Sequence, residues 1–262
     1  MKSLLAALLT SALALSTHAA TRIPADADAL ARAMQRTPVV LLGEVHDNAA
    51  QHALRAQALR KLLASGARPA IAFEQFDRGA QDAIDRARRE RPADVDYLIG
   101  EAQGASGWKW AFYKPFISLA LEYDLPIVAA NLGRTDAMKA AAGSDPVDAP
   151  EALVRAQEEA VRSGHCDLLP ADAIPGMARA QIARDRALAR SIMPFAARGV
   201  VLLTGNGHAR RDTGVPHWLA VPSTGIALLE EGEDVDGFDY YVVTDRAERA
   251  DPCVELRKRF GR

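Results

Sequence analysis

Four short apolar runs stand out along the chain, and each one ends in polar residues. They cover residues 39–42, 70–73, 126–130 and 200–203. Each run is partly β-branched and lacks alternation, a pattern that is typical of strands covered on both faces of a parallel sheet. Helical stretches separate the runs, and they are predicted over residues 49–64, 80–89, 115–123, 150–162 and 171–197.

The alternation of strands and helices predicts an α/β fold. We expect a mainly parallel sheet core of about four strands, flanked by helices. A helical insertion is expected between the third and fourth core strands, and segments 225–229 and 238–243 are expected to be C-terminal edge strands. Because the sequence shows no internal repeat or linker, residues 20–262 are predicted to form a single domain.

The N-terminal residues have the form of a secretory signal peptide. Met1 and Lys2 give a basic start, an apolar run follows, and small residues lead to Ala19 and Ala20. We therefore expect residues 1–19 to be a signal peptide and the protein to be periplasmic. A membrane anchor is the alternative, but the run is shorter than the roughly 20 residues that span a bilayer. No cysteine lies near the cleavage position, so a lipoprotein is not expected.

Charge and cysteine content narrow the classes of partner. The formal net charge is -2 and the pI is about 6.3, so the chain offers no basic field for nucleic acid. No other apolar stretch is long enough to span a membrane. The two cysteines, Cys166 and Cys253, are expected to form a disulfide in an oxidising compartment, and two buried thiols are the alternative.

Polar residues follow the predicted strands at positions that should meet in space. Glu44, His46, Glu74, Asn131 and His208 come just after the core strands. In open parallel sheets the carboxyl ends of the strands face one crevice, where ligands bind. The sequence therefore predicts a ligand crevice at this edge of the sheet.

Two strands lead into a G-x-x-H element, and a glutamate ends a third strand. Imidazole and carboxylate groups suit zinc, manganese or iron, and a metal-bound water would give a hydrolase. The candidate metal ligands, which are also the candidate catalytic residues of a hydrolase, are Glu44, His46, Glu74 and His208. Acid–base chemistry without a metal is an alternative, and so are histidines that are only hydrogen-bonded core groups.

Several segments together resemble the ChaN family of haem-binding proteins, which is part of the Tiki/TraB/erythromycin-esterase superfamily. They are LLGEVHDNAAQH, AFEQF, GWKWAFYKP, AANLGR, GHCDLLP and TGNGHARRDTGVP, and they run from about Pro38 to Cys253. The resemblance implies a parallel sheet core with many helices and a role in haem binding for iron uptake. Superfamily relatives are hydrolases that use the G-x-x-H residues, so a metal-dependent hydrolase is the alternative function.

Haem binding requires an axial ligand, an apolar wall and cations for the propionates. The candidate haem contacts are Tyr113, His46 and His208 as ligands, Trp110 as wall, and Arg134 and Arg210 as cations. The aromatic segment 108–113 has core packing as its alternative role.

Arg55 has two interpretations as well. It is expected either to reach the turn at Glu44 and His46, as an arginine does in esterase-like relatives, or to face solvent. The interpretation as a haem-binding protein is compatible with a homodimer that sandwiches the flat cofactor and with a partner in the haem-uptake machinery.

Overall fold

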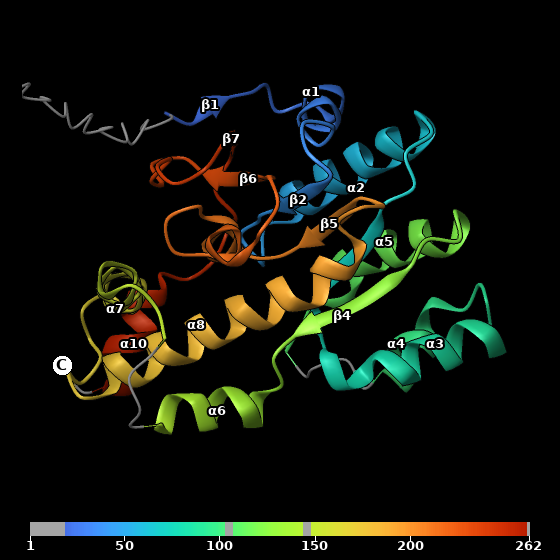
Figure 1. The fold of residues 1–262 in the computed structure, drawn as a ribbon. Coiled ribbons are helices and arrows are strands. Elements are labelled where there is room, and N and C mark those ends of the chain that lie inside the picture. Colours follow the sequence, from blue (N-terminus) through green and yellow to red (C-terminus); the bar gives the residue numbers. More distant parts are fainter. Residues whose placement is uncertain (1–18, 103–106, 144–147, 261–262) are drawn as a thin grey trace, which may run out of the picture.

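The computed structural model describes residues 19–102, 107–143 and 148–260, which form one sheet with helices on both faces (Figure 1). The predicted signal peptide at residues 1–19 lies outside the described residues, apart from Ala19. Among the helices that the structure describes, none is both long and apolar enough to cross a membrane.

The sheet has seven strands, all parallel to their neighbours, in the order β1-β7-β6-β2-β5-β3-β4. The strands are β1 (Thr21–Arg22), β2 (Val39–Leu42), β3 (Ala70–Asp77), β4 (Ile127–Asn131), β5 (Val200–Leu203), β6 (Ser223–Glu230) and β7 (Tyr240–Thr244). The predicted α/β class and parallel core are therefore confirmed, although the sheet is larger than the expected four strands.

The expectation that both C-terminal strands lie at the edge is wrong: β6 pairs with β7 on one side and β2 on the other, and β7 lies between β6 and the short strand β1. Its side chains explain this position. Ile226 and Leu228 lie in the core on one face of the sheet, and Ala227 and Leu229 lie in the core on the other face. Burial on both faces is the environment of an internal parallel strand, and β1 and β4 are the edges instead.

Ten α-helices surround the sheet in the described part of the chain. They are α1 (Ala27–Ala33), α2 (Ala49–Ala64), α3 (Gln81–Glu90), α4 (Val95–Glu101), α5 (Trp110–Glu122), α6 (Arg134–Ala142), α7 (Glu151–Gly164), α8 (Ala173–Ile192), α9 (Asn206–Ala209) and α10 (Pro252–Phe260). Short 3-10 helices cover Arg78–Ala80, Met193–Phe195 and Val215–Trp218. The helix predicted at 49–64 is confirmed, and α6, α7 and α8 form the predicted insertion between β4 and β5.

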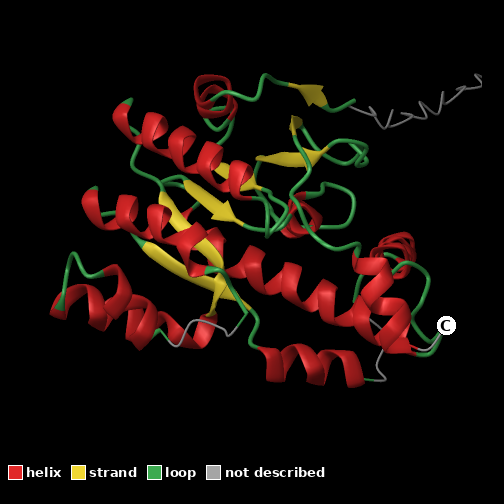
Figure 2. Ribbon diagram, turned by 180° about the vertical axis from the view of Figure 1, so that it is seen from behind, coloured by secondary structure: helices red, strands yellow, loops and turns green. Residues whose placement is uncertain are grey.

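The two faces of the sheet have separate cores. In β2, Val40 and Leu42 pack into the core shared with α1, α2 and α5, whereas Val39 and Leu41 pack into the core shared with α8. Figure 2 shows α2 and α5 lying over the first of these faces. This arrangement explains why the strands are apolar at every position, since each face needs side chains of its own.

The chain after β7 is held to the rest of the protein by an ion pair and by a disulfide. Glu230, buried at the end of β6, accepts hydrogen bonds from Asn48 Nδ2 (2.9 Å) and the Ala247 amide (2.8 Å), and it pairs with Arg249. Further on, Cys253 in α10 forms a disulfide with Cys166, just after α7, as the sequence predicted. The C-terminal segment is thereby linked both to the start of α2 and to the helical insertion.

We expect the disulfide to contribute to global stability, because it closes a long loop between residues 87 apart in sequence. Reduction should lower the free energy of unfolding by about 2–4 kcal/mol, through greater freedom of the unfolded chain. Urea unfolding with and without reductant measures this difference. The double variant Cys166→Ser/Cys253→Ser is the control and should show the lower stability whether or not reductant is present. Equal stability of the oxidised and reduced wild-type protein would contradict the prediction.

Candidate functional site

The two G-x-x-H turns pack directly against each other at the carboxyl ends of the central strands β2 and β5. A side chain added at Gly205 would place its Cβ 2.8 Å from His46 Cε1, and one added at Gly43 would lie 2.3 Å from Asn206 Oδ1. A larger residue at either position would therefore force His46 or Asn206 to move, so the two glycines allow the turns to approach closely. The predicted convergence of these segments at one edge of the sheet is what the structure shows.

Glu44 is the centre of the first cluster, and its buried carboxylate has partners on both oxygens. Oε1 accepts a hydrogen bond from the Tyr113 hydroxyl (2.5 Å) and lies 3.0 Å from His46 Nδ1. Oε2 forms an ion pair with Arg55 and lies 3.2 Å from His52 Nδ1. The cluster therefore joins the end of β2 to α2 and α5, the helices that carry these partners.

Arg55 faces the interior rather than solvent, which settles the alternative left open by the sequence. Its side chain is fully buried, it donates to the Leu42 carbonyl (2.7 Å), and its guanidinium lies 5.4 Å from the centroid of the Phe116 ring. Burial lowers the pKa of Arg55 to about 10, so it remains protonated at neutral pH. Burial also lowers the pKa of His52, to about 4, so that imidazole is neutral.

His46 is the solvent-facing member of this cluster. Its side chain is 48% exposed, and its Nδ1 is directed at Glu44. The Trp108 ring contacts its imidazole edge-on, with the centroids 4.9 Å apart. His52 Nε2 lies 3.1 Å from the His46 carbonyl oxygen, and this contact holds the backbone of the turn against α2. With Nδ1 occupied by a carboxylate, Nε2 is the nitrogen that His46 offers to a ligand.

Glu74 is the centre of the second cluster. It lies within β3, which runs on to Asp77, and it comes directly after Phe73, the last residue of β3 that pairs with β5. Its Oε2 accepts hydrogen bonds from the Thr204 hydroxyl (2.7 Å) and the Gly205 amide (2.9 Å). Its Oε1 lies 3.6 Å from His208 Nε2. Burial acts to raise the pKa of Glu74, but the charges of His208 and His46 and the two hydrogen bonds lower it overall. Glu74 is therefore a buried carboxylate at neutral pH.

His208 is held between two carboxylates. Its Nδ1 lies 2.6 Å from Asp185 Oδ1 on α8, and Gln157 on α7 donates to the other Asp185 oxygen (3.2 Å). Burial alone would lower the pKa of His208, but the charges of Asp185 and Glu74 raise it to about 9. Sequence reasoning missed Asp185. The available signal was that it is the only acidic residue of α8.

The four predicted metal ligands do not form one metal site. Glu44 and His46 belong to the first cluster, while Glu74 and His208 belong to the second. No group of three or more His, Cys, Asp or Glu side chains in the described residues is arranged to hold a metal ion. The physical reason lies in the ion pairs, because the Arg55 guanidinium is already bound to the carboxylate of Glu44.

The predicted aromatic contacts divide between the crevice and the core. Trp108 lies beside His46, whereas Trp110 stacks on Phe76 with centroids 5.0 Å apart. Tyr113 is fully buried, and burial raises the pKa of its hydroxyl. Core packing, the alternative interpretation of this segment, thus describes Trp110 and Tyr113.

The two predicted arginines lie in different settings. Arg134 is exposed at the first position of α6. Arg210 is bound to Asp212 (2.8 Å) and Asp234 (3.3 Å), and these carboxylates neutralise its guanidinium.

Two cavities flank the clusters. One of about 390 Å³ lies at the ends of β3 and β4, with Trp108, Arg134 and Arg184 in its walls. The other, of about 250 Å³, is lined by His208 and Asp185 and by parts of α7.

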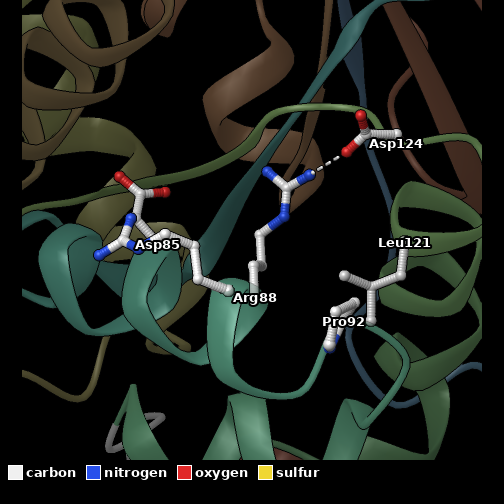
Figure 3. A pocket seen from close by; sticks show the side chains of 6 residues that line it. Asp85, Arg88, Pro92, Leu121 and Asp124 are labelled. Atoms are coloured by element: carbon white, nitrogen blue, oxygen red, sulfur yellow. Dashed lines mark hydrogen bonds and ion pairs between the residues drawn. The ribbon is translucent and has the colours of Figure 1, made fainter.

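Another cavity, of about 460 Å³, lies away from the candidate site, between α3 and the end of α5. Arg88 donates to Asp124 there (3.0 Å), as Figure 3 shows. None of the predicted site residues lines this cavity.

We expect Arg55→Met to destabilise the protein by about 3–5 kcal/mol, because the variant leaves Glu44 as a buried carboxylate without its guanidinium. Arg60→Met on the same helix is the matched control. Its partner is the exposed Glu122, and the expected cost is below about 1 kcal/mol. Chemical denaturation at neutral pH measures both variants. Similar small losses in the two proteins would refute a structural role for the Glu44–Arg55 pair.

We expect His208 to make stability depend on pH above neutrality. Its folded pKa of about 9 exceeds the ordinary value of 6.5, so its stabilisation is complete below pH 6.5 and is lost as pH rises through 9. Relative to His208→Gln, wild-type protein should lose on the order of 3 kcal/mol between about pH 6 and about pH 10. Denaturation at a series of pH values tests this, with His217→Gln, an exposed position of the 3-10 helix Val215–Trp218, as control. Parallel pH curves for wild type and His208→Gln would contradict it.

A known protein family resembles this chain in sequence, and solved structures resemble it in fold. The family described as haem-binding uptake, Tiki superfamily, ChaN matches residues 30–219. No curated protein matches the chain in sequence.

Two solved structures share the fold. ChaN of Campylobacter jejuni, described with cofacial haem binding, is similar over 82% of this chain and 89% of its own, at 19% identity and a TM-score of 0.71. The type III effector HopBA1 is similar over 89% and 100%, at 14% identity and a TM-score of 0.51. Because the family match covers most of the sequence, the chain belongs to the ChaN family of haem-binding uptake proteins in the Tiki superfamily.

Proposed function

We propose that this protein binds haem at the carboxyl edge of its sheet, with His46 Nε2 as the ligand to iron. The observation that carries the proposal is the half-exposed imidazole of His46, with Nδ1 directed at a buried carboxylate. A hydrogen bond from Nδ1 to Glu44 selects the tautomer with its lone pair on Nε2 and makes that nitrogen more basic. The family to which the chain belongs supports haem as the cargo.

The structure favours His46 over the other two candidate ligands. Tyr113 is buried behind Glu44 and donates its hydroxyl proton to that carboxylate, and burial disfavours its ionised form. His208 is held by Asp185, and its raised pKa keeps it protonated, so it has no lone pair for iron at neutral pH. His46 combines exposure with a fixed orientation.

The surroundings of His46 also fit a flat apolar ligand. Trp108 stands at the edge of the imidazole and also lines the cavity of about 390 Å³ that contains Arg134. An aromatic ring next to an exposed histidine offers an apolar wall, and the arginine offers a charge for a propionate. In this proposal Trp108, and not the predicted Trp110, is the apolar wall for the haem.

We propose further that two copies of the protein enclose the bound haem. The ligand site lies at an exposed edge of the sheet, so one copy leaves the outer face of a haem in solvent. The description of the Campylobacter jejuni protein as binding haem cofacially supports an arrangement in which two haems stack. Two copies, each with one haem on His46, would bury both outer faces in a single contact.

The cellular role that we propose is haem or iron uptake after export to the periplasm. The signal-peptide pattern of residues 1–19 supports export, and the Cys166–Cys253 disulfide fits an oxidising compartment. In this role the protein holds haem and passes it to a partner in the uptake machinery.

A hydrolase is the second candidate, and one observation favours it. His208 is oriented by the buried Asp185 and lies 3.6 Å from Glu74, an arrangement suited to proton transfer. Since His208 is protonated at neutral pH, its role would be that of a general acid. Ester hydrolysis that is present in wild-type protein and lost in His208→Ala would support this candidate.

Titration with hemin tests the haem proposal. Wild-type protein should saturate at a fixed ratio of hemin to protein with a shifted Soret band, and light scattering should give the mass of a dimer. His46→Ala should weaken binding by on the order of tenfold or more and change the band, because the iron loses its ligand. His217→Ala is the matched control, because His217 is exposed on the 3-10 helix Val215–Trp218, and it should behave as wild type. Absence of saturable binding by wild-type protein would overturn the proposal.

A further inference from the structure

The strand β4 is an edge of the sheet, and part of its backbone faces away from its one neighbour. On the inner side the Ile71 amide donates to the Pro126 carbonyl (2.8 Å). Backbone groups point alternately to the two sides of a strand, so residues 127 and 129 direct their amides and carbonyls away from β3. The opposite edge, β1, is only two residues long. A further strand would therefore find its pairing groups at β4.

The side chain of Gln81, the first residue of α3, already binds two of these outward groups. Its Nε2 donates to the Ile127 carbonyl (2.9 Å), and its Oε1 accepts a hydrogen bond from the Ala129 amide (2.8 Å). These are the carbonyl and the amide that flank Val128, and a neighbouring strand would pair with both. Nε2 also donates to Asp85 Oδ1 (3.1 Å), one turn further along α3, which fixes the orientation of the amide. The Gln81 amide thus takes the place of one residue of an eighth strand.

There is room for a strand beside β4. A cavity of about 430 Å³ lies against residues 126–129, and Gln81, Ser191 and Phe195 contribute to its other walls. In Figure 1, β4 lies at the side of the sheet next to α3 and α4. Residues 127–130 are all apolar, whereas charged side chains protect many other sheet edges from pairing. The hydrogen bonds of Gln81 therefore protect this edge in place of a charge on the strand.

We infer that Gln81 closes the β4 edge and keeps two copies of this protein from joining their sheets through it. Two identical edges can pair antiparallel about a twofold axis, because each copy then offers the other the same carbonyl and amide groups. The apolar strand β4 would become internal in a sheet that continues through both copies. This role concerns the outer side of β4 and does not depend on haem binding at His46.

Removal of the Gln81 side-chain amide tests this inference on the haem-free protein. Gln81→Ala should self-associate about tenfold more tightly than wild type, as expected when hydrogen bonds that compete with pairing are lost. Sedimentation velocity over a series of protein concentrations measures this dissociation constant. Gln81→Asn keeps an amide but is one methylene shorter, so it should behave like Gln81→Ala. Gln57→Ala, at an exposed position of α2, is the matched control and should associate no more than wild type.

Amide hydrogen exchange locates the contact between the copies. In dilute protein, the Ala129 amide should exchange faster in Gln81→Ala than in wild type, because it has lost its acceptor. In concentrated protein, residues 127–131 of the variant should become protected as the edges pair. Self-association that leaves these residues unprotected, or no added self-association in either Gln81 variant, overturns the inference. Circular dichroism of each variant verifies that the fold is retained.

Discussion

The buried ion pair between Glu44 and Arg55 is the interaction on which the geometry of the crevice depends. A carboxylate at the end of a central strand is costly to bury, and the structure offsets that cost with the Arg55 guanidinium on α2 and the Tyr113 hydroxyl on α5. The same carboxylate then directs the one ring nitrogen of His46 that faces inward. The orientation of the exposed histidine is thus a consequence of how β2, α2 and α5 are held together.

The histidines of the two G-x-x-H turns lie in different environments. Both G-x-x-H turns follow a buried strand, yet the side chain of His46 is 48% exposed while that of His208 is 13% exposed. The difference comes from Asp185 and Gln157, which belong to the helical insertion and cover His208. An uncovered imidazole suits a ligand, whereas an enclosed, protonated one suits a structural or acid role.

The insertion between β4 and β5 also supplies the charged groups that surround the crevice. Arg134 begins α6, and Arg184 and Asp185 are adjacent on α8, where they line separate cavities. The disulfide joins the end of α7 to the C-terminal helix, so the segment that carries these groups is linked to the last part of the chain. The helical insertion that carries these charged groups is therefore also the segment that the disulfide joins to the C-terminal helix.

The sequence by itself determined the strands of the core, the helix at 49–64, the cysteine pair and the edge of the sheet where the polar residues meet, because each depends on local pattern or simple topology. It did not determine that β6 and β7 are internal, since strand order depends on long-range pairing. It also left open whether Arg55 faces inward, and it did not place Asp185 beside His208. Only the tertiary structure decided these points, because the burial and charge of a side chain depend on neighbours that are distant along the chain.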